Sequence, residues 1–324
     1  MSTVEQTAVR ERTMSRRGLL GIEELSTDQI QQILDRARVY QPLETRTGKK
    51  LDTLRGRTII HLFYEASTRT RTSFEIAAKR LGADTISISA DGSSVKKGES
   101  LLDTLNTLAA MRPDAIVMRH FSSGAPHFLA RYLETPIINA GDGTHEHPTQ
   151  ALLDALTILD HKPALRGLRV AIIGDIVHSR VARSNIHLLT KFEAEVVLCG
   201  PPPMLPRAFE CFSPRVHCTY RMEEAIAGAD VIMMLRVQLE RQSQYLFASD
   251  NEYFRFYGLR LEHLQAAAPD AIVMHPGPIN RGRELASEVA DFPRSVILNQ
   301  VENGIAVRMA VLDLLLSGQV GARL

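Results

Sequence analysis

Residues 58–82 read TIIHLFYEASTRTRTSFEIAAKRLG, and the order of side chains in this stretch decides the fold. The apolar run 58–63 predicts a buried strand, and apolar residues at helical spacing predict a helix over 69–81 that ends near Gly82. Between them, Ser67-Thr68-Arg69-Thr70-Arg71 places hydroxyls and guanidiniums at a helix N-terminus. Free backbone N–H groups and the helix dipole make this position suitable for a phosphate. The alternative is an ordinary N-cap Ser or Thr with solvated arginines.

The same alternation of strand and helix continues along the chain, which favours parallel sheets covered on both faces. We therefore predict an α/β fold with two doubly wound parallel-sheet domains and the active site between them. Residues 1–17 form a polar extension, which we expect to be disordered. The further strands are predicted at 84–89, 115–118, 136–139, 168–173, 194–199, 231–235 and 271–274, and the clearest helices at 27–40, 101–109, 151–159 and 302–316.

Composition excludes several classes of function. The chain has 324 residues, a formal net charge of +1 and no Trp. A near-neutral chain offers no long-range field to a nucleic acid or an anionic membrane, and base stacking needs aromatic side chains. No apolar run is long enough to span a bilayer. Cys199, Cys211 and Cys218 lack metal-type spacing, so we interpret them as buried free thiols of a cytoplasmic protein.

Four further clusters of polar residues follow predicted strands or lie in polar loops. They are Lys96-Lys97-Gly98, Arg119-His120, His147-Pro148-Thr149-Gln150 and His275-Pro276-Gly277-Pro278. Each has an ordinary structural explanation when taken alone, such as a solvated lysine pair or a hydrogen-bonded core histidine. In open parallel sheets, however, ligands bind beyond the carboxyl ends of the strands, where these clusters fall.

Together with Ser67-Thr68-Arg69-Thr70, the order and spacing of these clusters resemble the carbamoyltransferases, and most closely their aspartate-specific catalytic chains. The resemblance covers residues 18–320. It implies transfer of the carbamoyl group of carbamoyl phosphate to the amine of L-aspartate, a step of de novo pyrimidine biosynthesis. It also implies a carbamoyl-phosphate-binding domain over 18–148, an aspartate-binding domain over 149–301, and a C-terminal helix, 302–324, that packs back on the first domain.

The resemblance assigns roles to individual residues. Arg69, Thr70, Arg119, His147 and Gln150 are expected to be catalytic. Carbamoyl phosphate is expected to contact these five together with Ser67, Thr68, Gly277 and Pro278. Some members carry Leu at the position of Gly277, but a backbone carbonyl contact needs no side chain. Ser93 and Lys97 are expected to reach the site from a neighbouring subunit of a homotrimer.

The second half of the chain carries the implied acceptor site. Arg180, Arg236 and Gln238, with Lys97, match aspartate-binding residues, and two arginines can hold two carboxylates bidentately. Glu65 and Arg241 match residues that hold the domains closed with Arg180; surface salt bridges of little energy are the alternative. The Ser-Met-Gly and His-Cys-Leu-Pro elements typical of ornithine enzymes do not occur in the sequence.

The sequence implies no metal and no cofactor. The histidines and cysteines lack zinc-type spacing, and neither a Gly-x-Gly-x-x-Gly fingerprint nor a Walker loop is present. Three alternatives stay open: a transcarbamoylase for ornithine or putrescine, a non-catalytic scaffold, and a dinucleotide-binding dehydrogenase. The sequence does not show whether regulatory or dihydroorotase-like chains bind.

Overall fold

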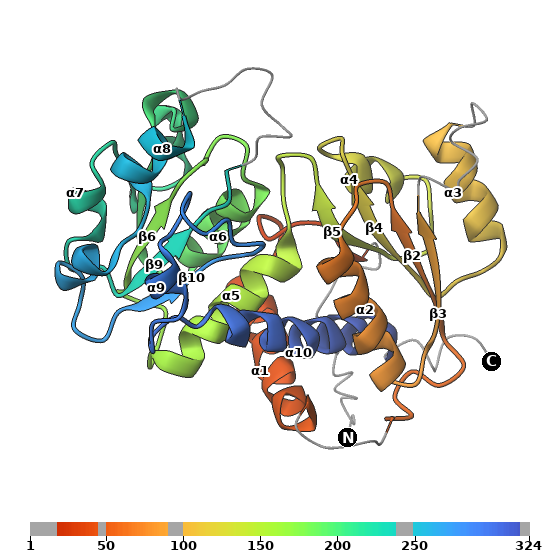
Figure 1. Ribbon diagram of the computed structural model, residues 1–324. Helices are drawn as coiled ribbons and strands as arrows, with labels where there is room; N and C mark the ends of the chain where they lie inside the picture. The colour runs from red at the N-terminus through yellow and green to blue at the C-terminus, as the bar shows by residue number, and fades with distance from the viewer. Residues whose placement is uncertain (1–17, 45–49, 90–99, 238–248, 318–324) are drawn as a thin grey trace, which may run out of the picture.

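The computed structural model describes residues 18–44, 50–89, 100–237 and 249–317, which form two parallel sheets side by side (Figure 1). The strand order of the first sheet is β1-β5-β4-β2-β3 and that of the second is β10-β9-β6-β7-β8. The first sheet contains β1 (Gly18–Leu19), β2 (Thr58–Phe63), β3 (Asp84–Ser89), β4 (Ala115–His120) and β5 (Ile137–Asp142). The second contains β6 (Arg169–Ile173), β7 (Glu195–Cys199), β8 (Val216–Thr219), β9 (Val231–Met234) and β10 (Ile272–Met274).

Helices connect the strands and cover the sheets. They are α1 (Thr27–Glu44), α2 (Thr68–Arg80), α3 (Leu101–Ala110), α4 (Ala125–Leu129), α5 (Pro148–His161), α6 (Arg180–Lys191), α7 (Met222–Ile226), α8 (Asp250–Tyr257), α9 (Ser287–Ala290) and α10 (Ile297–Leu316). The 3₁₀ turns are η3 (Pro202–Met204), η4 (Arg207–Phe212) and η6 (Leu261–Gln265). The fold class predicted from the sequence, two doubly wound parallel sheets, is confirmed.

The differences from the predicted elements have physical causes. Two edge strands were not predicted: β1 has only 2 residues, and the 4 residues of β8, Val-His-Cys-Thr, do not form a continuous apolar run. The strand β5 continues beyond the predicted end through Gly141 and Asp142, and α10 begins at Ile297 rather than at residue 302. Cys199 and Cys218 are buried, but the expectation that Cys211 is buried is wrong. It lies on η4, a surface 3₁₀ turn, where its side chain is exposed.

The helix α10 packs against α1, α2 and α5, and it crosses beneath the gap between the two sheets (Figure 1). Its buried apolar residues belong to the same core cluster as residues from both sheets, for example Ile59 of β2 and Ile172 of β6. Asp313 of α10 is buried and accepts a hydrogen bond of 2.8 Å from the Tyr40 hydroxyl of α1. The C-terminal helix therefore joins both halves of the molecule.

The described helices are all too short or too polar to cross a membrane.

Candidate active site

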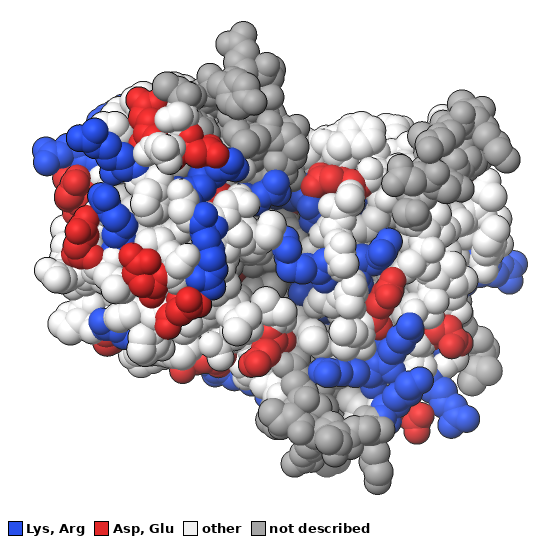
Figure 2. Space-filling view, in the orientation of Figure 1, with Lys and Arg blue, Asp and Glu red and all other residues white. Residues whose placement is uncertain are grey.

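A cleft of about 990 Å³ opens at the carboxyl ends of both sheets. Basic side chains gather at this hollow between the two halves of the molecule (Figure 2). Among the described residues that line it, Glu65 is the one acid, and five arginines face it. They are Arg69, Arg119, Arg180, Arg236 and Arg308. Such an excess of fixed cations in one concave site suits small anionic ligands.

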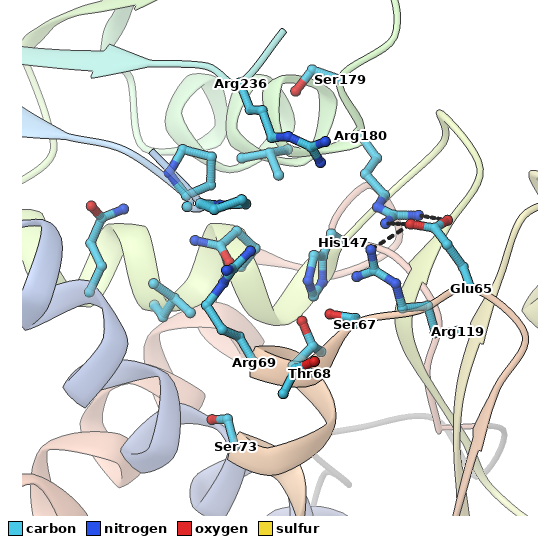
Figure 3. A pocket seen from close by; sticks show the side chains of 18 of the residues that line it. Glu65, Ser67, Thr68, Arg69, Ser73, Arg119, His147, Ser179, Arg180 and Arg236 are labelled. Carbon is cyan, nitrogen blue, oxygen red and sulfur yellow. Dashed lines mark hydrogen bonds and ion pairs between the residues drawn. The ribbon is translucent and has the colours of Figure 1, made fainter. Parts of the chain in front are cut away.

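The N-terminus of α2 forms one wall of the cleft (Figure 3). Ser67 is the N-cap residue with an extended backbone (φ −158°), and within the described chain its side chain makes no capping hydrogen bond. The first-turn N–H groups of a helix have no intrahelical acceptor, so they remain available to a ligand. Thr70 is buried in this first turn, and Arg69 extends from it into the cleft. The N-cap alternative is therefore not supported for Ser67.

Glu65 joins the two halves of the site. Its Oε1 accepts hydrogen bonds from Nη2 of Arg119, at 2.6 Å, and from Nη2 of Arg180, at 2.7 Å. Its Oε2 accepts a third, 3.0 Å long, from Nη1 of Arg180. Glu65 follows β2, Arg119 lies in β4 and Arg180 begins α6 of the other half. The two bonds from Arg180 therefore join the second half of the molecule to the first (Figure 3).

Arg180 fits this position only because Gly141 has no side chain. A Cβ on Gly141 would lie 2.9 Å from Nε of Arg180, and the backbone there has φ +113°, which side chains other than glycine rarely adopt. Nη1 of Arg180 also donates to the carbonyl oxygen of Gly143, at 3.3 Å. The turn after β5 thus fixes the direction of this guanidinium.

Arg69 and Arg236 approach the cleft from opposite halves and repel each other. Burial and the charge of Arg236 together lower the pKa of Arg69. Burial, Arg69 and Arg236 lower the pKa of His275 to about 3, so the imidazole is neutral. The N–H of Gly277 donates to Nδ1 of His275, at 2.9 Å, which leaves the proton on Nε2. That Nε2 is buried and has no partner among the described residues, so it is available to an acceptor atom in the cleft.

A buried amide network supports the floor of the cleft. Asp154 of α5 is fully buried and accepts hydrogen bonds from Gln150 (2.9 Å), Asn185 (2.8 Å) and Gln300 (2.7 Å). The Oε1 of Gln300 in turn accepts from the backbone N–H of His275, at 2.9 Å. Burial raises the pKa of Asp154 to about 6, although the three amide donors act in the opposite direction. This carboxylate therefore connects α5, α10 and the end of β10.

Most of the residues predicted from the sequence meet in this cleft. Its lining includes Glu65, Ser67, Thr68, Arg69, Thr70, Arg119, His147, Gln150, Arg180, Arg236, Gly277 and Pro278. His147 is nearly buried at the N-cap position of α5, and its backbone N–H donates to Ser184 Oγ, at 2.8 Å. Ser93, Lys97, Gln238 and Arg241 lie outside the described residues. The roles assigned to all of these residues stay predictions.

The sequence reasoning missed Arg308, Asp154 and Gln300. Arg308 lines the cleft, is buried, and donates hydrogen bonds to Ser73 Oγ (2.9 Å) and the Gly304 carbonyl (2.8 Å). Arg308 is the single arginine in the mostly apolar stretch 305–316. A charged residue in such a stretch indicates a buried, hydrogen-bonded group, so the sequence could have identified it. Asp154 likewise stands among apolar residues of α5, which could have indicated a buried carboxylate. Nothing in the sequence around Gln300 indicated its position.

Family models match nearly the whole described chain. The model "Aspartate/ornithine carbamoyltransferase, carbamoyl-P binding domain" matches residues 17–160, and "Aspartate/ornithine carbamoyltransferase, Asp/Orn binding domain" matches residues 166–315. The chain belongs to the aspartate/ornithine carbamoyltransferase family. The first match ends within α5 and the second begins before β6, so both sheets and the cleft between them are covered by the family.

Similar carbamoyltransferases agree with this assignment. The aspartate carbamoyltransferase catalytic subunit of Solibacter usitatus is 73% identical over 296 residues, which cover 91% of this chain and 98% of that relative. Aspartate transcarbamoylase from Trypanosoma cruzi in complex with N-(phosphonacetyl)-L-aspartic acid aligns with TM-score 0.84 at 30% identity, over 94% of this chain and 97% of that one. Ornithine carbamoyltransferase from Pyrococcus furiosus aligns with TM-score 0.83 at 29% identity, over 94% and 98%.

The substitution Asp154→Asn tests the buried carboxylate. The folded-state pKa is about 6 and the ordinary value 3.8, so between these pH values the folded protein keeps a proton that the unfolded chain has released. The ionisation of Asp154 therefore lowers the free energy of unfolding of the parent as pH rises from 4 to 6. The variant has no carboxyl group at this position, so its stability does not change with pH for this reason. We expect the free energy of unfolding of the variant, minus that of the parent, to rise by about 3 kcal/mol over this window.

Urea denaturation of parent and variant between pH 4 and 7.5 measures this difference. Asp160→Asn, at the exposed end of the same helix, is the matched control for the loss of one carboxylate. A difference between Asp154→Asn and the parent that stays constant with pH would contradict the assignment.

Proposed function

We propose that this chain transfers the carbamoyl group of carbamoyl phosphate to the amine of L-aspartate, giving N-carbamoyl-L-aspartate and phosphate. One observation supports this most strongly. Arg69 and Arg236 face each other across the cleft and repel, with Arg119 and Arg180 beside them and Glu65 as the one described lining acid. A pair of anionic substrates relieves this repulsion. One substrate carries a phosphate and the other carries two carboxylates. Together they supply the negative charge that would balance the arginines of the cleft.

The α2 side of the cleft is the proposed phosphate site. Ser67, Thr68 and the first-turn N–H groups of α2 offer neutral donors, and Arg69 offers a guanidinium. Hydrogen bonds from charged donors to phosphate are the strongest that such a site can provide. The carbamoyl end then extends toward Arg119 and His147, with Gln150 and the backbone carbonyls of Gly277 and Pro278 as partners for its amide.

The second half is the proposed aspartate site. Arg236 follows β9 and Arg180 begins α6, so both guanidiniums enter the cleft from that half (Figure 3). We assign Arg236, Arg180, Gln238 and Lys97 to the two carboxylates of aspartate. The trypanosomal relative has been solved with carbamoyl phosphate and aspartate together, which supports one shared cleft for the two substrates.

The proposed mechanism relies on positioning and on charge stabilisation. The amine attacks the carbamoyl carbon, and negative charge grows on the carbonyl oxygen. Arg119, Thr70 and His147 are the proposed donors to that oxygen, and the loss of one such donor typically costs about 100- to 1000-fold in rate. The departing phosphate accepts the amine proton, so no protein base is assigned. Holding both substrates in attack geometry provides the rest of the acceleration.

Closure and assembly complete the proposal. Glu65 with Arg180 and Arg241 holds the two halves closed over the substrates, and the observed bonds between Glu65 and Arg180 support this. We assign residues 18–148 to the carbamoyl-phosphate-binding domain, together with the C-terminal helix, and 149–301 to the aspartate-binding domain. The chain acts as a cytoplasmic homotrimer in which Ser93 and Lys97 of one subunit complete the site of the next.

An acceptor assay decides between this function and its nearest alternative. Purified protein is given labelled carbamoyl phosphate with L-aspartate, ornithine or putrescine, and the carbamoylated product is separated and counted. We expect transfer to aspartate alone, because two arginines in the acceptor half require a dicarboxylate. Transfer only to ornithine or putrescine would overturn the acceptor assignment, and a folded chain without any transfer would favour a scaffold.

Replacement of Arg69 by Ala tests the phosphate site. Because one charge-assisted pair of hydrogen bonds to phosphate is lost, we expect the Kd for carbamoyl phosphate to rise by about 100-fold or more. Arg71→Ala is the matched control, since Arg71 lies on the same helix, outside the cleft lining, and faces Glu75 at 3.9 Å. Calorimetric titration gives both constants. Equal Kd values for the two variants would contradict the proposed phosphate site.

Subunit hybrids test the shared site. Lys97→Ala and Arg69→Ala chains are each expected to be nearly inactive alone. In mixed trimers, some sites combine an intact Arg69 from one chain with an intact Lys97 from the other, so part of the activity should return. The measurement is turnover after the two variants are dissociated, mixed and reassembled. Mixtures no more active than the separate variants would show that each chain has its own complete site.

A further inference from the structure

A second group of chemically reactive side chains lies outside the cleft, between α4 and the turn that leads from β5 to His147. One potential ligand atom from each of His127, Asp142 and His145 lies within 4.8 Å of the other two. They come from three segments: α4, the end of β5, and the turn between β5 and α5. The imidazole rings of His127 and His145 are 5.2 Å apart at an angle of 75°. No motif indicates this group, because His127 is distant in the chain from the other two residues.

The hydrogen bonds of His127 prepare one of its nitrogens to bind a metal. Its Nε2 lies 2.7 Å from Oε1 of Glu24, so the carboxylate holds the proton on Nε2. Nδ1 then carries the lone pair, and this atom is buried with no hydrogen-bond partner among the described residues. A histidine whose second nitrogen donates to a carboxylate is the arrangement that metal-binding histidines use.

Asp142 and its surroundings supply the charge. Its side chain is fully buried; Oδ1 accepts from Asn139 Nδ2 (2.8 Å) and from the N–H of Glu146 (3.1 Å). Its Oδ2 accepts from the N–H of Gly124, at 2.6 Å, and lies 3.1 Å from Nδ1 of His145. Glu24 lies beside His127 and Asp142 lies beside His145, so each imidazole has a carboxylate next to it. The local charge therefore favours a cation.

We propose that His127, His145 and Asp142 form a zinc site, with water as the fourth ligand and Glu24 orienting His127. Two imidazole nitrogens and one carboxylate oxygen are a donor set that Zn²⁺ accepts in tetrahedral geometry, whereas Mg²⁺ and Ca²⁺ prefer oxygen ligands throughout. Ligand atoms around tetrahedral zinc lie about 3.3 Å apart, so small side-chain rotations close the present spacing. The ion replaces the proton between His145 and Asp142, which passes to solvent.

The proposed site has a structural role, distinct from the transfer reaction. His127, Asp142 and His145 are absent from the lining of the cleft, although the neighbouring residues Gly143 and Thr144 belong to it. A bound ion ties the short helix α4 to the turn between β5 and α5. That turn carries the Gly143 carbonyl, which accepts from Arg180, and leads directly to His147. Zinc is therefore expected to stabilise the fold around the cleft without entering it.

The experiment measures zinc binding to the full-length protein after treatment with a chelator and its removal. Isothermal titration with ZnCl₂ is expected to show one site per chain that His127→Gln and His145→Gln weaken by at least about 100-fold. Glu24→Gln, which leaves all three ligands in place, is expected to weaken binding by about 10- to 100-fold. His161→Gln, at an exposed position of α5, is the matched control and should bind as the parent does.

Thermal unfolding provides the second readout. Zinc should raise the Tm of the parent and of His161→Gln, and should have much less effect on His127→Gln, because a ligand that binds only the folded state stabilises it. MgCl₂ at the same concentration should not raise the Tm. Circular dichroism establishes that each variant is folded before titration. Zinc affinity that is unchanged in His127→Gln and His145→Gln, or absent in the parent, would overturn the proposal.

Discussion

The site depends on one carboxylate that is shared between two guanidiniums. Glu65 accepts hydrogen bonds of 2.6–3.0 Å from Arg119 of the first sheet and from Arg180 of the second half. Both arginines are nearly enclosed, with side chains 11% and 4% exposed, so each would be costly to bury without an opposite charge. The shared acid therefore fixes the two halves relative to each other and directs both cations toward one cleft.

Two buried charged groups at the cleft, Arg308 and Asp154, are hydrogen-bonded to neutral groups. Arg308 is bonded to a hydroxyl and a carbonyl, and Asp154 is surrounded by three amide donors rather than by direct ion pairs. Burial lowers the pKa of Arg308 to about 10 and raises that of Asp154 to about 6, which shows that both charges are poorly solvated. Burial of a poorly solvated charge costs free energy, and groups with such shifted pKa values are common at functional sites.

Much of the fold and of the site could be predicted from the sequence. Buried runs such as 58–63 and 84–89 matched strands β2 and β3 to the residue, because apolar stretches between polar turns are local signals. Polar residues directly after these strands had to lie at one edge of a parallel sheet, and twelve predicted site residues line the cleft. The resemblance to the family added what spacing alone could not, namely the substrates and the expectation of a shared site between subunits.

The sequence by itself determined the alternation of strands and helices, the two sheets and the position of the Ser67-Thr68-Arg69-Thr70 turn at the start of α2. These depend on periodicity and on capping residues within a short stretch of chain. Only the tertiary structure decided that Glu65 contacts Arg119 as well as Arg180, that Gln300 links Asp154 to the backbone of His275, and that His127 lies beside His145. Each of these contacts joins segments that are brought together by burial of the shared core, and such contacts leave no period or motif in the chain.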